Sequence, residues 1–158
     1  MRESVEKRWQ ENRLLAALPE RDRSRLIPQL EILTLFARES VHEAGEEMNF
    51  VYFPLDCIVV LISSVEAEAT VEVGMIGNEG FAGAPILMGA KHSNSQALIL
   101  AEGKALRLPS AVLRKEAKRS SRIREVMLTY ANALLAQSAL SPPAIVITHH
   151  KLDLHVSC

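Results

Sequence analysis

Residues Val71–Leu108 read VEVGMIGNEGFAGAPILMGAKHSNSQALILAEGKALRL and carry the strongest indication of the fold. Strand-like stretches stand at both ends of this segment, because aliphatic residues there alternate with polar ones. Between them lie a turn punctuated by glycines, a short apolar helix-like piece at Pro85–Met88 and a polar loop. This order predicts a β-rich domain that contains one short helical turn.

The preceding segments extend the same pattern. Ile58–Ile62 is a continuous apolar run, and Phe50–Phe53 is aromatic and β-branched, as strands favour. Glu31–Phe36 alternates in polarity, and Glu43–Glu46 has the composition of a turn. Many short strands separated by glycine turns indicate a sandwich or a barrel. We therefore expect a mainly β fold with flanking helices, in which residues 31–108 form a double-sheet jelly roll.

Helices are predicted on both sides of this β region. In residues 1–30, Asn12 can cap a helix that Pro19 ends, and a second short helix follows. In residues 109–140, a short helix is followed by a long one, SSRIREVMLTYANALLAQSAL, with serine at its start as a cap.

The composition is that of an ordinary globular protein. The chain has 158 residues, of which 48% are hydrophobic and 23% are charged, so it can bury a core. Its net charge of −1 provides no overall attraction to nucleic acid. The charged N-terminus lacks the apolar region of a signal peptide, and no apolar run approaches the roughly 18 residues of a membrane span. We expect a cytoplasmic protein with no membrane contact, in which Cys57 is a buried thiol.

Three segments resemble a known family. They are GEEMNFVYFPLDCIVVLISSVE from Gly45, EVGMIGNEGFAGAPILMG from Glu72 and GKALRLP from Gly103. Their order and spacing look like the strand pair, the phosphate-binding turn and the closing strand of the cyclic-nucleotide-binding-like domain in bacterial Crp/Fnr-type transcription regulators. The resemblance covers about Asn12 to Leu140, although Cys57 stands where the family often has glycine. It implies a jelly-roll sensor domain, an effector and a homodimer.

The resemblance also implies where an effector would bind. The family usually holds a cyclic phosphate with an arginine and with backbone N–H groups at a short helix, and it holds the ribose with a glutamate. Here Phe81 stands at the glutamate position, and neutral residues stand around the arginine position, where Lys91 is the nearby cation. The small residues of the turn still allow an anion to approach the backbone. The candidate ligand-binding residues are Gly80, Phe81, Ala82, Gly83, Ala84, Asn94, Ser95, Gln96 and Ala97.

Three interpretations of this segment stay open. The loop closes the barrel and binds nothing, or it binds a different small anionic effector, or it binds a cyclic nucleotide. Losing one charge-assisted partner costs about 1.5–3 kcal/mol, and two such partners are absent. We therefore expect cyclic AMP to bind weakly or not at all.

The long helix carries an apolar stripe with three- and four-residue spacing. Its apolar far end, around Leu134 and Leu135, favours a dimerisation helix, and the alternative is a helix packed only on its own barrel. Nearby basic residues are expected to form a solvated helix face; they are Arg114, Lys115, Lys118, Arg119, Arg122 and Arg124. The candidate dimer-interface residues are Ile123, Val126, Met127, Tyr130, Leu134 and Gln137.

Residues 141–158 lack a helical period and are predicted to be an irregular tail. Family members continue at this point into a DNA-binding helix-turn-helix, so we expect DNA binding only in a full-length relative. A shifted reading frame from Pro142 permits residues that are common in the family, which suggests a frameshift. We expect no metal site, because adjacent histidines such as His149 and His150, near His155, point apart on a strand.

The leading hypothesis is the ligand-sensing, dimerising domain of a Crp/Fnr-type regulator that does not respond to cyclic AMP. The first alternative is a stand-alone cyclic-nucleotide-binding protein that signals through protein contacts. A small cupin-like metalloenzyme is the second, but His42 and His92 are too isolated in the sequence for a metal cluster. No motif supplies a nucleophile with its base, so we expect no catalytic residue.

Overall fold

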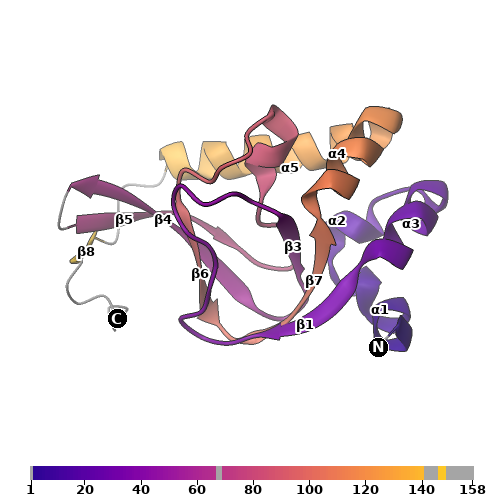
Figure 1. Cartoon of the computed structure of the whole chain (residues 1–158), viewed down its shortest axis with the longest axis horizontal. Helices are drawn as coiled ribbons and strands as arrows, with labels where there is room; N and C mark the ends of the chain where they lie inside the picture. Colours follow the sequence, from indigo (N-terminus) through magenta and orange to yellow (C-terminus); the bar gives the residue numbers. More distant parts are fainter. Residues whose placement is uncertain (1, 67–68, 141–145, 149–158) are drawn as a thin grey trace.

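Two antiparallel sheets form the centre of the computed structural model, which describes residues 2–66, 69–140 and 146–148 (Figure 1). One sheet has the strand order β1-β7-β3, and the other has the order β2-β6-β4-β5-β8. Strands distant in the sequence are neighbours in both sheets, as in a jelly roll, which confirms the predicted fold class. The strands are β1 (Glu31–Leu35), β2 (Ser40–His42), β3 (Phe50–Pro54), β4 (Ile58–Glu66), β5 (Ala69–Ile76), β6 (Gln96–Ala101), β7 (Gly103–Pro109) and β8 (Val146–Thr148).

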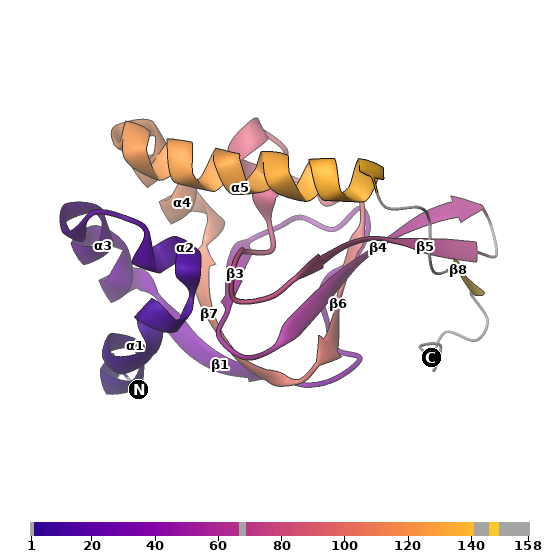
Figure 2. The same ribbon diagram turned by 180° about the vertical axis from the view of Figure 1, so that it is seen from behind.

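Helices gather at one end of the sheets and along one side (Figures 1 and 2). The N-terminal helices pack at the end from which β1 and β7 emerge, and α5 runs along the length of the barrel. The helices are α1 (Arg2–Arg8), α2 (Arg13–Ala16), α3 (Glu20–Leu26), α4 (Ser110–Arg119) and α5 (Ser121–Leu140), with 3-10 turns η1 (Trp9–Glu11), η2 (Ile27–Gln29) and η3 (Ala84–Met88).

The buried apolar side chains form two clusters. The helix-side cluster joins the N-terminal helices, α4 and α5 to the outside of the barrel, and its members include Leu18, Phe53, Phe81, Leu113 and Ile123. The barrel cluster fills the space between the sheets, and its members include Tyr52, Val59, Ala82, Ile99 and Leu134. Because successive side chains of a strand point to opposite faces, Tyr52 and Phe53 enter different clusters.

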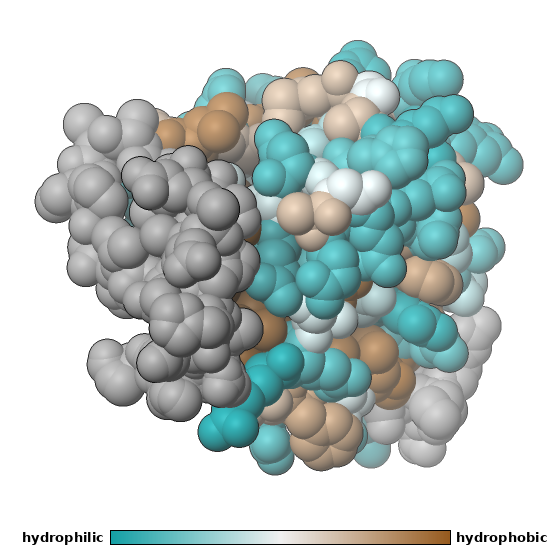
Figure 3. Space-filling model, turned by 60° about the vertical axis from the view of Figure 1, so that its left-hand side comes forward, coloured by the Kyte–Doolittle hydropathy of each residue, from teal (hydrophilic) through white to brown (hydrophobic). Residues whose placement is uncertain are grey.

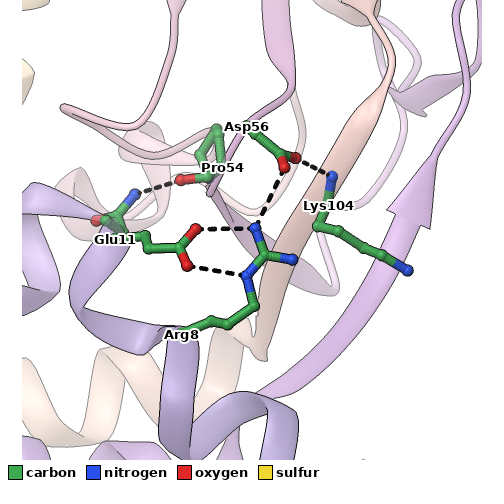
Figure 4. A network of polar contacts seen from close by, with 6 residues as sticks. Arg8, Glu11, Pro54, Asp56 and Lys104 are labelled. Carbon is green, nitrogen blue, oxygen red and sulfur yellow. Dashed lines mark hydrogen bonds and ion pairs between the residues drawn. The ribbon is translucent and has the colours of Figure 1, made fainter.

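A polar network holds the N-terminal segment against the barrel (Figure 4). Arg8 pairs with Glu11 at 2.8 Å and with Asp56 at 3.2 Å, while Asp56 accepts the N–H of Lys104. Asn12 is fully buried and has two roles. Its Oδ1 accepts the N–H groups of the next helical turn, as a cap does, and its Nδ2 donates to the carbonyl oxygens of Pro54 and Gly80 at 2.9 and 3.0 Å.

The tail differs in part from its prediction. Val146–Thr148 forms β8, which pairs antiparallel with Ala69–Val71 of β5. The physical reason is that β5 is otherwise an edge strand with unpaired N–H and C=O groups, which an extended segment can satisfy. The other tail residues, including His149, His150 and His155, lie outside the described residues. Within the described part of the chain, no helix is both long enough and apolar enough to cross a membrane.

Candidate functional site

The glycine-punctuated turn lies between β5 and η3, with Gly80, Phe81, Ala82, Gly83 and Ala84 all buried. Gly83 has φ of 120°, a conformation that glycine adopts without strain, and a Cβ at this position would lie 2.6 Å from a methyl carbon of Val51. The backbone therefore packs directly on β3.

Phe81 does not face the interior of the barrel. Its side chain is fully buried in the helix-side cluster, where it stacks on Phe53 with ring centroids 5.4 Å apart and contacts Tyr130 at 5.8 Å. The ring of Phe81, which was predicted to stand at the ribose-binding position, thus packs outside the barrel in this structure. The next residue, Ala82, belongs to the barrel cluster, so the period of two puts a methyl group on the inner face.

The backbone of Ala82 is already paired. Its N–H donates to the carbonyl oxygen of Tyr52 at 2.8 Å, and its own carbonyl accepts the N–H of Tyr52 at 3.0 Å. An anion at this turn would have to break that bridge to use this amide. The N–H of Ala82, one of the groups that were predicted to form an anion nest, is thus already used in pairing with β3.

The polar loop places its four candidate residues in two environments. Asn94 is exposed, and the N–H of Ser95 donates to the hydroxyl of Ser93 at 3.2 Å. Gln96 begins β6 and donates to Ser40 Oγ at 2.8 Å, while Ala97 is buried in the barrel cluster. The structure brings this loop near the glycine turn through η3, but it adds no cation beyond the exposed Lys91.

Arg107 is a cation on the inner face that the sequence pattern did not single out. It is the register partner of Tyr52, and cross-strand partners share a face. Its guanidinium lies 4.2 Å from the centroid of the Phe50 ring and 2.7 Å from Glu31, so a carboxylate already neutralises its charge. The alternation of β7, with Arg107 between buried leucines, was the signal that could have identified it.

Two titratable groups near Arg107 are held neutral by burial. Desolvation lowers the pKa of His42, whose Nε2 lies 3.0 Å from the carbonyl oxygen of Phe50. Burial also raises the pKa of Tyr52, although Arg107 opposes this shift. His42 and Tyr52 are in edge contact, with ring centroids 5.7 Å apart. The inner face at this end of the barrel is therefore aromatic and nearly uncharged.

Tyr130 connects α5 to the glycine turn. A Cβ at Gly80 would lie within 3.0 Å of three atoms of the Tyr130 side chain, so the ring rests directly on the Gly80 backbone. Its hydroxyl is buried without a hydrogen-bond partner, and burial, with Glu79 nearby, raises its pKa above the usual range. The ring touches both apolar clusters, so α5 contacts the turn and the barrel interior through one side chain.

The apolar stripe of α5 packs on its own barrel. Ile123 and Met127 are fully buried, Leu134 is 9% exposed, and Val126 and Tyr130 are half-buried. Ile123, Met127 and Leu134 are therefore covered by the chain's own barrel, whereas Val126, Tyr130 and Gln137 keep exposed surface, and the dimer interface stays a prediction. Of the predicted set, only Gln137 is exposed.

No metal-binding group appears among the described residues: they contain no cluster of three or more His, Cys, Asp or Glu side chains. His42 is buried beside Phe50, whereas His92 is exposed on the loop.

Two surface clefts are also found, of about 370 and 320 Å³, and both lie among the helices rather than between the sheets.

The fold matches those of known cyclic-nucleotide-binding domains. The sensor domain of the transcriptional regulator DNR from Pseudomonas aeruginosa superposes with a TM-score of 0.67 at 12% identity, over 89% of this chain and 98% of that one. The regulatory domain of Toxoplasma gondii PKA, solved with cAMP, superposes with a TM-score of 0.69 at 12% identity, over 84% of this chain and 50% of that one. The regulatory subunit of a cAMP-independent protein kinase A from Trypanosoma brucei superposes with a TM-score of 0.67 at 14% identity, over 84% of this chain and 45% of that one.

These identities establish the fold alone. The chain has the jelly-roll fold of cyclic-nucleotide-binding domains, and its structural neighbours include the sensor domain of a transcriptional regulator. No protein-family model matches the sequence, and no curated protein sequence matches it. Because the neighbours include one solved with cAMP and one described as cAMP-independent, the fold does not determine the ligand.

Proposed function

We propose that this chain is a ligand-sensing, dimerising domain of a Crp/Fnr-type transcription regulator and that it does not respond to cyclic AMP. We expect it to act by binding rather than by catalysis. The observation that carries this proposal is the state of the glycine turn. All five turn residues are buried, Phe81 packs among the helix-side residues, and the amide of Ala82 is paired with β3.

The physical argument concerns the charge of the phosphate. A cyclic nucleotide buries a negative charge, which is costly unless cations or N–H donors replace its water. The turn and the loop offer neutral side chains at Asn94, Ser95 and Gln96, and Arg107 is already paired with Glu31. An uncharged or weakly charged effector would leave less charge to neutralise in this aromatic and apolar interior than a nucleotide would.

Isothermal titration calorimetry with cyclic AMP and cyclic GMP tests the proposal. We expect no dissociation constant below about 1 mM, which corresponds to roughly −4 kcal/mol. A matched variant, Ser95→Arg, restores a cation at the edge of the loop and is expected to strengthen binding. Phe81→Glu is unsuitable as a partner, because it would bury a carboxylate in an apolar cluster. A micromolar dissociation constant for the unmodified protein would favour instead a stand-alone cyclic-nucleotide-binding protein.

Dimerisation is assigned to the outer face of α5. From Val126 to Gln137 the helix contains no charged residue, and Leu135 is 58% exposed. In Figure 3, brown and pale side chains lie among teal ones along the upper edge, the edge at which Figure 1 draws α5 and η3. A helix face without charges can be buried in a protein contact at lower cost, because no charged group has to lose its water.

Light scattering tests this assignment. We expect a homodimer at tens of micromolar, and we expect Leu135→Glu to give a monomer with an unchanged circular dichroism spectrum. Ala111→Glu, at an exposed position of α4, is the matched control and should remain dimeric. A monomeric unmodified protein, or a dimer that persists in Leu135→Glu, would contradict this use of the outer face.

A further inference from the structure

A cleft of about 370 Å³ lies where α3 meets the junction of α4 and α5. Both ribbon views place these helices side by side at the end of the molecule away from the C-terminal strand (Figures 1 and 2). Four of its seven lining residues are arginines. The lining residues are Arg21, Asp22, Arg25, Arg119, Ser120, Ser121 and Arg122.

We propose that this cleft binds a phosphate group, at a site separate from the barrel. Arginine has a planar fork of donors that matches phosphate oxygens, and four such groups reach this cleft from α3, α4 and α5. The volume suits a small ligand rather than a macromolecule. Arg119 and Arg122 were predicted to belong to a solvated helix face; both are exposed, and both line this concave surface with Arg21 and Arg25.

The arginines differ in how far their donors are already used. Arg25 is held by Glu116 and by Asp22, each at 2.8 Å, and both carboxylates are buried. Arg119 lies 3.7 Å from Glu116, which is too long for a hydrogen bond, and Arg122 forms an exposed pair with Glu125 at 3.3 Å. Among the described contacts, the guanidinium of Arg21 has no partner. Three arginines thus have donors available for an anion.

The start of α5 adds backbone donors. Ser120 accepts the N–H of Ile123 with its hydroxyl and the N–H of Arg124 with its carbonyl oxygen. The first N–H groups of a helix have no partner within the helix, and here they belong to Ser121 and Arg122, which line the cleft. The dipole of this 20-residue helix also favours a negative charge at its start.

Asp22 neutralises part of the positive charge of the cleft. Its side chain is 2% exposed and its Oδ1 pairs with Arg25 at 2.8 Å, while its Oδ2 is buried without a hydrogen-bond partner. The charge available to an anion therefore comes mainly from the exposed arginines, which are Arg21, Arg119 and Arg122.

Titration calorimetry with inorganic phosphate at low ionic strength tests the proposal. We expect saturable binding that is about tenfold weaker in Arg21→Gln and in Arg122→Gln, each of which removes one charge from an exposed position. Lys115→Gln removes the same charge from α4 outside the cleft and should bind as the unmodified protein does. Glycerol phosphate distinguishes a monoester from the free anion.

Three outcomes would overturn the proposal. The first is the absence of saturable phosphate binding. The second is equal weakening by Lys115→Gln and Arg21→Gln, which would show only general attraction to positive charge. The third is loss of binding in Lys91→Gln but not in the arginine variants, which would place the anion at the glycine turn.

Discussion

Gly80 provides the sharpest test of how α5 is joined to the glycine turn. A Cβ at this position would lie within 3.0 Å of three Tyr130 atoms, closer than real Cβ atoms approach any heavy atom. The φ of Gly80 lies outside the left-handed region, so Gly80→Ala adds no backbone strain. Its cost is the displacement of a ring that is packed against Phe81. Overpacking of this kind costs about 1–3 kcal/mol, and we expect the upper part of that range.

The assay is urea unfolding at one fixed protein concentration, since dimerisation would make stability depend on concentration. With an m value of about 2 kcal/mol/M, Gly80→Ala should lower the midpoint by about 1 M. In a Tyr130→Leu background the same substitution should cost less than about 0.5 kcal/mol, because the obstructing ring is gone. Gly45→Ala is the control: it has φ of 85° and open space, so its cost of about 1 kcal/mol should not depend on Tyr130.

A coupling energy near zero between Gly80→Ala and Tyr130→Leu would refute this reasoning. It would mean that the ring does not rest on the turn, and that α5 does not sense the turn through this contact. A coupling of about 2 kcal/mol would instead identify Tyr130 as the mechanical connection between the turn and the helix.

Three further predictions follow from the buried polar groups. Asn12→Ala should lower the free energy of unfolding in urea by about 2–4 kcal/mol, because it removes a helix cap and leaves the carbonyls of Pro54 and Gly80 without a donor. The control is Asn132→Ala at an exposed position, which should change this free energy by less than about 0.5 kcal/mol. Because the pKa of His42 is lowered in the folded state, the unfolded chain binds more protons at mildly acidic pH. The free energy of unfolding should therefore keep its full value above pH 6.5 and decrease as the pH falls from there through the folded-state pKa. His42→Phe should flatten this dependence on pH, and an unchanged slope in the variant would contradict the prediction. Burial raises the pKa of Cys57 to about 11, so its thiol should react slowly in the folded protein. In a Cys158→Ser background, iodoacetamide at pH 8 should label the folded protein far more slowly than the protein in urea. Equal labelling rates would contradict the burial of Cys57.

Much of the fold was predictable from local chemistry. Asn12 caps α2 as expected, the turn at Gly45 has a positive φ, and η3 covers the expected Pro85–Met88. These features depend on residues close in the sequence, namely a side chain that reaches the next N–H groups, or a glycine that tolerates a left-handed backbone. The same locality explains why the strands of residues 31–108 were recognised from alternation and β-branched content.

The candidate site was predictable only in its position along the chain. The sequence indicated that Gly80–Ala84 forms a tight turn, but it could not indicate that Ala82 pairs with Tyr52 or that Arg107 shares the inner face with it. Such contacts join residues about 30 to 55 positions apart. They depend on strand register, which many long-range contacts determine together.

The sequence by itself determined the elements of this protein: a strand-rich centre, glycine turns, a capped N-terminal helix and a long helix with an apolar stripe. Only the tertiary structure decided which surface each element covers. The stripe of Ile123, Met127 and Leu134 would suit either a second copy or the protein's own barrel, and packing assigned it to the barrel. The alternation at Phe81 and Ala82 required opposite faces, but the register of β3 decided which residue entered the barrel. The physical reason is that periodicity specifies which residues lie together on a face, whereas the partner of that face is set by the summed free energy of contacts distant in the sequence.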